Sequence, residues 1–275
     1  MQLVDLKFQP GIDKQDTAYS AGDQRKYVDS DFVRFHYGKP ERWGGWVYLP
    51  NPNKTIVGVV RDTHSWVGLD GIRYLALGTD RKLYIYTEGA VYDITPIRET
   101  ASLTNPFTTN GTTTVSVADA AHGASVGDFV TFDSFSTIDG LDMNQEFEIT
   151  SVTSASAYTV THTSTASGST SGGGGSGNAK YQITTGPATS TYGYGWGTET
   201  WGASTWDTAR SSSNVVLSAR QWSLDNFGED LIATVLNGGT FIWDTSGGVG
   251  SRATALSNAP TASRFSLVST DTRHL

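Results

Sequence analysis

One pattern occurs twice in this chain: "RDTHSWVGLDGIRYLALGTDRKLYIYTE" at residues 61–88 and "RQWSLDNFGEDLIATVLNGGTFIWDTS" at residues 220–246. Laid together, Trp66 falls on Trp222, and "YLALGT" falls on "LIATVL". In both copies a turn and an apolar-aromatic strand follow ("LYIY", "TFIW"), and "RFSLVSTDTRHL" at 264–275 resembles the start of a third copy. Repeated units of short strands joined by tight turns predict the blades of a β-propeller.

Composition supports an all-β fold. Hydrophobic residues make up 37% of the 275 residues, charged residues only 17%, and 31 residues are glycine. No long segment carries apolar residues at helical spacing, whereas Gly- and Thr-rich turns separate short apolar runs. A propeller needs about four blades to close its ring. We therefore expect a propeller that is incomplete in this chain and continues beyond residue 275.

The middle of the chain differs from its ends, because no Lys or Arg lies between Arg98 and Lys180. Its segments alternate apolar and polar residues, as half-buried strands do: "TTTVSVAD", "GDFVTFDSF", "QEFEITSVT" and "AYTVTHTST". A run of Gly and Ser, "SGSTSGGGGSGN", closes the region and is typical of a flexible segment. Residues 105–178 are therefore predicted to form a small inserted β-barrel or β-sandwich.

These observations predict five regions. They are an N-terminal extended segment (1–45), a first blade region (46–104), the inserted β domain (105–178), a Gly/Trp-rich connector (179–213) and a further blade region (214–275).

The connector contains "YGYGWGTETWGASTW" at residues 192–206, in which Trp196, Trp201 and Trp206 are five residues apart. This step fits neither the period of a helix nor that of a strand, so the stretch is predicted to be a loop. Its rings could pack on the chain's own sheets, lie in a subunit interface or stack on a sugar. The three tryptophans are therefore candidate interface residues.

No pattern in the sequence indicates catalysis, a cofactor or a metal. The five histidines lack ligand spacing and are expected to be hydrogen-bonded or surface residues; there is no cysteine. "DGLD" at 139–142 is too short for a calcium loop and is predicted to be a turn. The acidic residues of the insert could supply a carboxylate pair for glycoside hydrolysis, although such residues are ordinary on a soluble β domain. The net charge of −8 argues against general nucleic-acid binding, but not against a conduit that repels phosphate.

Two stretches carry a resemblance to a known family: "DSDFVRFHYGKPERWGGW" (29–46) and "WSLDNFGEDLIA" (222–233). They resemble the tail nozzle proteins of short-tailed bacteriophages, also described as packaged-DNA or head–tail stabilisation proteins. The Gly/Trp loop between insert and blade supports the similarity, which covers most of the chain and is weakest in the insert. Nozzle proteins of this kind are longer, with further blades.

The resemblance implies a propeller-based subunit of a hexameric ring that lies below the portal and adaptor and forms the terminal DNA-exit conduit. It also implies a virion location after synthesis in the host cytoplasm, contacts with tail fibres or tailspikes, and DNA that passes without specific binding. No signal peptide or membrane-spanning run is expected. A cluster of basic residues precedes the insert: Arg25, Lys26, Arg34, Lys39 and Arg42. Of these, Arg34 and Arg42 are candidates for salt bridges to a neighbouring subunit or to the adaptor. A receptor- or carbohydrate-binding tail protein is the main alternative, and a polysaccharide-cleaving enzyme is a second.

Overall fold

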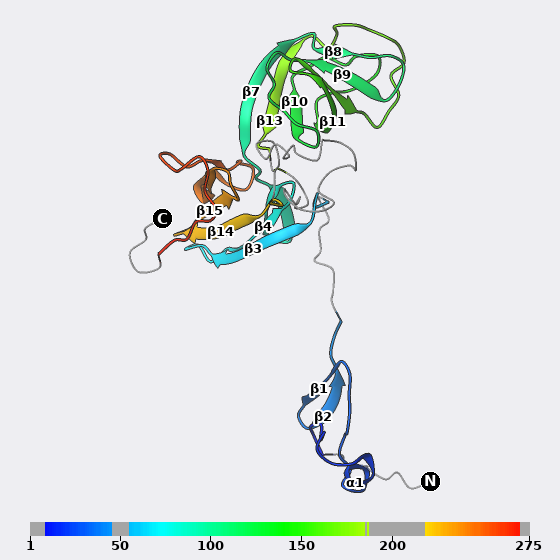
Figure 1. The fold of residues 1–275 in the computed structure, drawn as a ribbon, viewed down its shortest axis with the longest axis vertical. Coiled ribbons are helices and arrows are strands. Elements are labelled where there is room, and N and C mark those ends of the chain that lie inside the picture. Colours follow the sequence, from blue (N-terminus) through cyan, green and yellow to red (C-terminus); the bar gives the residue numbers. More distant parts are fainter. Residues whose placement is uncertain (1–8, 46–54, 185, 187–217, 270–275) are drawn as a thin grey trace, which may run out of the picture. The chain divides into compact units, whose positions relative to one another are not determined.

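The computed structural model describes residues 9–45, 55–184, 186 and 218–269. The chain divides into two compact units, an N-terminal unit of residues 1–50 and a main unit of residues 51–275. Nearly all regular structure in both units is antiparallel β-sheet, as Figure 1 shows. The expected all-β fold is confirmed.

The N-terminal unit contains a short helix and a hairpin rather than only extended chain. Helix α1 (Ala18–Asp23) is capped by Thr17, whose side chain accepts a hydrogen bond from Ser20 N. Strands β1 (Val33–His36) and β2 (Lys39–Arg42) pair through a two-residue turn. Both turn residues, Tyr37 and Gly38, have positive φ, as a tight hairpin turn requires. Among the described hydrophobic residues of this unit only Ala21 is buried.

The two repeated stretches form two similar sheets. Sheet 1 consists of β3 (Val60–Val67), β4 (Arg73–Thr79), β5 (Leu83–Thr87) and β6 (Ala90–Asp93). Sheet 2 consists of β14 (Trp222–Phe227), β15 (Asp230–Val235), β16 (Thr240–Trp243) and β17 (Thr254–Ala255), with the short 3₁₀ helix η2 (Thr245–Gly247) after β16. Each sheet has four antiparallel strands in chain order, the arrangement of a propeller blade. The described residues contain two such four-stranded sheets, fewer than a closed ring needs, so a closed propeller stays a prediction.

The predicted alignment of the repeats holds for the second and third strands but not for the first. Trp66 pairs with Tyr74 beside the β3–β4 turn, whereas Trp222 pairs with Val235 at the far end of its hairpin. The turn after β3 has five residues (68–72) and the turn after β14 only two (228–229). The alignment of Trp66 with Trp222 is therefore wrong, because the two hairpins have different turn lengths.

Sheets 1 and 2 pack face to face around a shared apolar core that contains both tryptophans. Trp66 donates its Nε1–H to Glu229 O of sheet 2 at 2.8 Å, and Trp222 donates its Nε1–H to Thr79 O of sheet 1 at 2.7 Å. Gly78 makes room for the second ring, because a Cβ there would lie 2.7 Å from Trp222. The indoles thus tie each sheet to the backbone of the other, and β14 lies beside β3 and β4 in Figure 1.

The predicted third copy begins on sheet 2 in the same manner. Asp62 Oδ2 of β3 accepts a hydrogen bond from Leu224 N of β14, at 3.1 Å. Asp225 Oδ2 of β14 in turn accepts one from Val268 N, at 2.8 Å. Residues 264–268 form no strand, but they lie on sheet 2 through the same kind of carboxylate–backbone bond that holds sheet 2 on sheet 1.

The inserted region is a seven-stranded antiparallel sheet in the order β7-β13-β10-β11-β12-β9-β8. Its strands are β7 (Ile97–Thr104), β8 (Phe107–Thr108), β9 (Thr114–Ala118), β10 (Phe129–Asp133), β11 (Glu146–Ser154), β12 (Ala157–Thr161) and β13 (Ser176–Gln182). All four alternating segments form strands as predicted. The strands of this sheet share one apolar core, and its outer strands β7 and β8 are separated in the chain only by Asn105 and Pro106. The sheet includes residues on both sides of the predicted range 105–178.

The Gly/Ser run is not a flexible linker. Gly173 and Phe107 exchange two backbone hydrogen bonds, at 2.8 and 3.2 Å, and Asn105 N donates to Gly175 O at 2.7 Å. Glycines are needed because side chains would collide with the core: a Cβ on Gly173 would lie 2.5 Å from Ile138 Cδ1. The prediction of flexibility is wrong because composition does not distinguish a linker from a close backbone approach.

Candidate functional site: a buried charged junction

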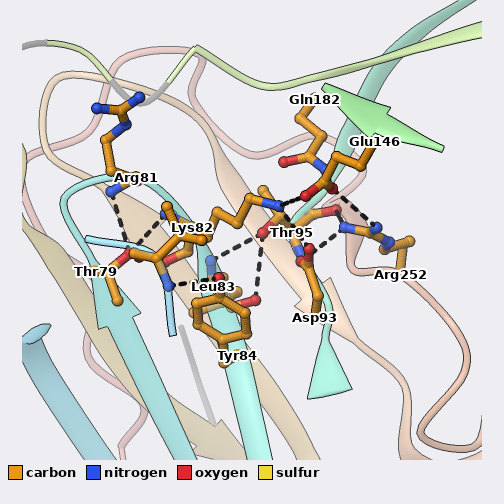
Figure 2. Close-up of polar contacts among 11 residues, drawn as sticks. Thr79, Arg81, Lys82, Leu83, Tyr84, Asp93, Thr95, Glu146, Gln182 and Arg252 are labelled. Atoms are coloured by element: carbon orange, nitrogen blue, oxygen red, sulfur yellow. Dashed lines mark hydrogen bonds and ion pairs between the residues drawn. The ribbon is translucent and has the colours of Figure 1, made fainter. Parts of the chain in front are cut away.

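Lys82 is the centre of a polar cluster that joins sheet 1, the inserted sheet and a loop of sheet 2 (Figure 2). The tight turn before β5 aims this residue inward: Lys82 N donates to Thr79 Oγ1 at 2.7 Å, and Thr79 N donates to Lys82 O at 2.8 Å. The Lys82 side chain has no exposed surface. A fully buried lysine is rare unless its charge is compensated.

Two carboxylates compensate it. Asp93, the last residue of β6, places Oδ2 3.0 Å from Lys82 Nζ, and Glu146, the first residue of β11, accepts a hydrogen bond from the same ammonium. The ammonium also lies 4.3 Å from the centre of the Phe129 ring, a favourable cation–π position. Sheet 1 and the inserted sheet therefore share one buried charge.

Arg252 joins the loop before β17 to this cluster. Its Nη1 donates to Asp93 Oδ1 at 2.7 Å and to Thr95 O at 3.1 Å. From the inserted sheet, Gln182 Nε2 donates to Glu146 Oε2 at 2.6 Å. We call Lys82, Asp93, Glu146 and Arg252 the charged junction. Its two cations balance its two carboxylates.

The junction keeps Asp93 ionised. Burial opposes the charged form of Asp93, but Lys82 and Arg252 outweigh it together with hydrogen bonds from Thr95, so the pKa of Asp93 is lowered. Each charged group of the cluster is paired with a group of opposite charge. The cluster is therefore better suited to holding the sheets together than to transferring protons. Near it, Arg81 binds Glu148 at 2.5 Å and Gly127 O at 3.1 Å, a second link between sheet 1 and the insert.

A further set of buried hydrogen bonds lies in the core of the inserted sheet. The Tyr181 hydroxyl donates to Asp119 Oδ2 at 2.5 Å and lies 2.9 Å from the Tyr158 hydroxyl. Burial raises the pKa of both tyrosines, so both hydroxyls remain protonated. These hydrogen bonds join β12 and β13 in the core, where both tyrosines and Asp119 are buried.

Of the residues predicted as interface sites, the two arginines lie in the part of the chain that the structure describes. Trp196, Trp201 and Trp206 lie outside the described residues. Arg34 lies on β1 and binds Glu41 of β2, with both side chains exposed. Arg42 is an exposed residue at the end of β2. Their predicted role in subunit contacts stays a prediction.

Four of the five histidines, His36, His64, His122 and His162, lie in the described ranges and are hydrogen-bonded or exposed residues, and the "DGLD" segment is a turn. His122 Nδ1 accepts a hydrogen bond from Ala124 N, and His162 Nδ1 accepts one from Ser164 N, so both rings are parts of turns. Asp139 and Gly140 have positive φ within a tight turn. His64 lies between the sheets, where its Nε2 is 2.8 Å from Asn226 Oδ1.

The sequence carried no signal for the junction. Lys82 stands beside Arg81 in a turn, where both would be assigned to the surface, and Asp93 and Arg252 are isolated charges. Glu146 is one of several acidic residues in the insert and has no pattern that sets it apart. The junction residues come from separate parts of the chain, and only the folded structure shows that they meet.

Within the described ranges, no group of three His, Cys, Asp or Glu residues is placed to hold a metal ion. The same ranges contain no helix with the length and apolar character needed to cross a membrane.

Comparison with known proteins identifies no family. No family model matches the chain, and no curated protein matches it. Among solved structures, the chain is similar to one titled "Phage phi92 endosialidase", at 16% identity and a TM-score of 0.28. The match covers 70% of this chain but only 29% of that one. A similarity of this strength is too low to transfer either a fold or an activity.

Proposed function

We propose that this chain is a structural subunit of the tail nozzle of a short-tailed bacteriophage. In this role it forms part of a ring through which the genome leaves, and it helps to retain packaged DNA. The observation that carries the proposal is the pair of similar four-stranded sheets stacked face to face, because the sequence resemblance implies a propeller-based subunit. The charged junction supports it, since it mounts the inserted sheet on both blade-like sheets.

The charge distribution supports the same role. The N-terminal unit has seven basic and seven acidic residues, so the whole net charge of −8 belongs to the main unit. An acidic surface repels phosphate and lets DNA pass without adhering. In the proposed role the chain acts on DNA as a conduit, without a catalytic step.

The proposed partners follow from the ring. They are further copies of the chain in a hexamer, the adaptor and portal above it, and tail fibres or tailspikes beside it. The proposed location is the virion.

Immunogold labelling of intact phage particles tests this function, with antibodies raised against the main unit. We expect gold at the distal end of the short tail. Label confined to the fibres or tailspikes would contradict the nozzle and favour the receptor-binding alternative. Particles that lack the protein serve as the control and should be unlabelled.

A further inference from the structure

The hairpin tips of sheets 1 and 2 are joined by a hydrogen bond, and each carries exposed apolar side chains. Val67 and Leu69 are exposed at the β3–β4 tip, Leu69 to 93%, and Phe227 is exposed at the β14–β15 tip. Glu229 holds the tips together: its Oε1 accepts a hydrogen bond from Leu69 N at 2.5 Å. We call Val67, Leu69 and Phe227 the tip patch. Large apolar side chains gathered on a surface mark an interaction site more often than single ones do.

An acidic groove of about 340 Å³ adjoins the tip patch. Its charged lining residues are Asp225 and Glu229, and within the described residues no Lys or Arg lines it. Asp70, in the neighbouring turn, adds a third carboxylate. The surface therefore suits a partner that presents apolar and basic side chains together.

The hairpin of residues 32–43 in the N-terminal unit presents that combination. Phe32, Tyr37 and Trp43 are exposed, Tyr37 to 92%. The same twelve residues contain three basic side chains, Arg34, Lys39 and Arg42, against the single acidic Glu41.

Within residues 9–45, this unit has almost no apolar core of its own. Ala21 is its single buried hydrophobic residue within the described range 9–45, and the chain has no cysteine to form a disulfide. Segments of about 40 residues seldom hold a fixed structure without disulfides, metals or a partner. The exposed aromatic residues of the hairpin therefore indicate a surface that is covered in the assembly.

We propose that the 32–43 hairpin docks on the tip patch and acidic groove of a second copy of this chain. The inference rests on the ring proposed above and names the contact that builds it. Every copy carries one hairpin and one groove, so the contact joins unlike surfaces head to tail. Such a heterologous contact closes into a ring when its rotation permits. Leu69 and Tyr37 are the residues whose apolar surface the contact would bury.

Sedimentation velocity on the purified chain tests the contact through two variants, Leu69→Asp and Tyr37→Asp. Each is matched by a control at another exposed apolar site: Val126→Asp (64% exposed) in the insert and Tyr19→Asp (85% exposed) in α1. We expect the wild type and both controls to associate. Each test variant should weaken association about tenfold or more, because a carboxylate would be buried in an apolar contact. All four side chains are exposed, so thermal unfolding of the variants should match the wild type.

An equimolar mixture of the two test variants gives the second readout. Leu69→Asp retains an intact hairpin and Tyr37→Asp retains an intact groove, so the mixture should form dimers that cannot extend. A mixture that stays monomeric would contradict the contact. A hairpin that binds the groove of its own chain would give the same monomeric result and would also contradict it. Rings that persist in both variants would overturn this contact but leave the ring function standing. A monomeric wild type would contradict the ring itself.

Discussion

Lys82 has no exposed surface, and its ammonium is neutralised by carboxylates from two different sheets. A buried ion pair of this kind adds little net stability, because removing charges from water costs about as much as their attraction returns. Loss of one member is costly, since it leaves an unpaired buried charge. Lys82 is therefore best understood as a residue that defines how sheet 1 meets the insert.

Lys82→Met should lower the free energy of unfolding by about 3 kcal/mol, because Glu146 loses its closest cation while Arg252 still neutralises Asp93. Chemical denaturation followed by tryptophan fluorescence measures this change. The matched control is Lys180→Met, which removes a half-exposed ion pair with Asp133 and should cost less than about 1 kcal/mol. Equal effects of the two variants would contradict the role of the junction.

The lowered pKa of Asp93 predicts a dependence on acid. A carboxyl group whose pKa falls on folding stabilises the protein above its ordinary pKa, and this stabilisation is lost as the pH falls through the folded value. Stability should therefore decline as the pH falls below about 4 towards the lowered pKa of Asp93, and Asp93→Asn should decline less steeply over the same acid range. Denaturation curves at several pH values provide the comparison. Identical slopes for the two proteins would show that Asp93 is not held ionised.

At the scale of elements, alternation and turn chemistry predicted most strands. The strands of the insert and the "LYIY" and "TFIW" strands of the repeats follow from local pattern. The offset of β3 against β14 could not be predicted, because the lengths of their turns decide it. The ordered Gly run could not be predicted either, because its glycines pack against Ile138 and Phe107, which are distant in sequence.

Gly177→Ala tests whether the Gly run is packed. A Cβ at this position would lie 2.5 Å from the Asp133 carbonyl oxygen and 2.7 Å from Phe135 Cδ2, so β13 or its neighbour must move. We expect a loss of about 1–3 kcal/mol of unfolding free energy. Gly250→Ala is the control, since its Cβ would meet nothing within 4 Å. If both variants unfold like the wild type, the run is not packed against β10.

The contact between sheets 1 and 2 depends on indole donors as well as apolar area. Trp222→Phe removes the indole donor to Thr79 O in a buried contact, at a cost of about 1–2 kcal/mol. Trp43→Phe, at an exposed site, should change stability little. Unfolding free energies from denaturant titration decide the matter. No difference between the variants would mean that the hydrogen bond contributes nothing to the sheet contact.

At the scale of the whole molecule, charge and exposure are distributed unevenly between the two units. The N-terminal unit is neutral and carries exposed aromatic residues, while the main unit carries the net charge of −8. The sequence could predict the basic residues of the hairpin, including Arg34 and Arg42. It could not predict the groove, because Asp225 and Glu229 meet Val67 and Leu69 only after the two sheets have stacked.

Negative-stain electron microscopy of the purified chain tests the central claim most directly, because a nozzle subunit must form a ring. The ring proposal predicts class averages with rotational symmetry and a central hole. Single compact particles at the highest attainable concentration would contradict it.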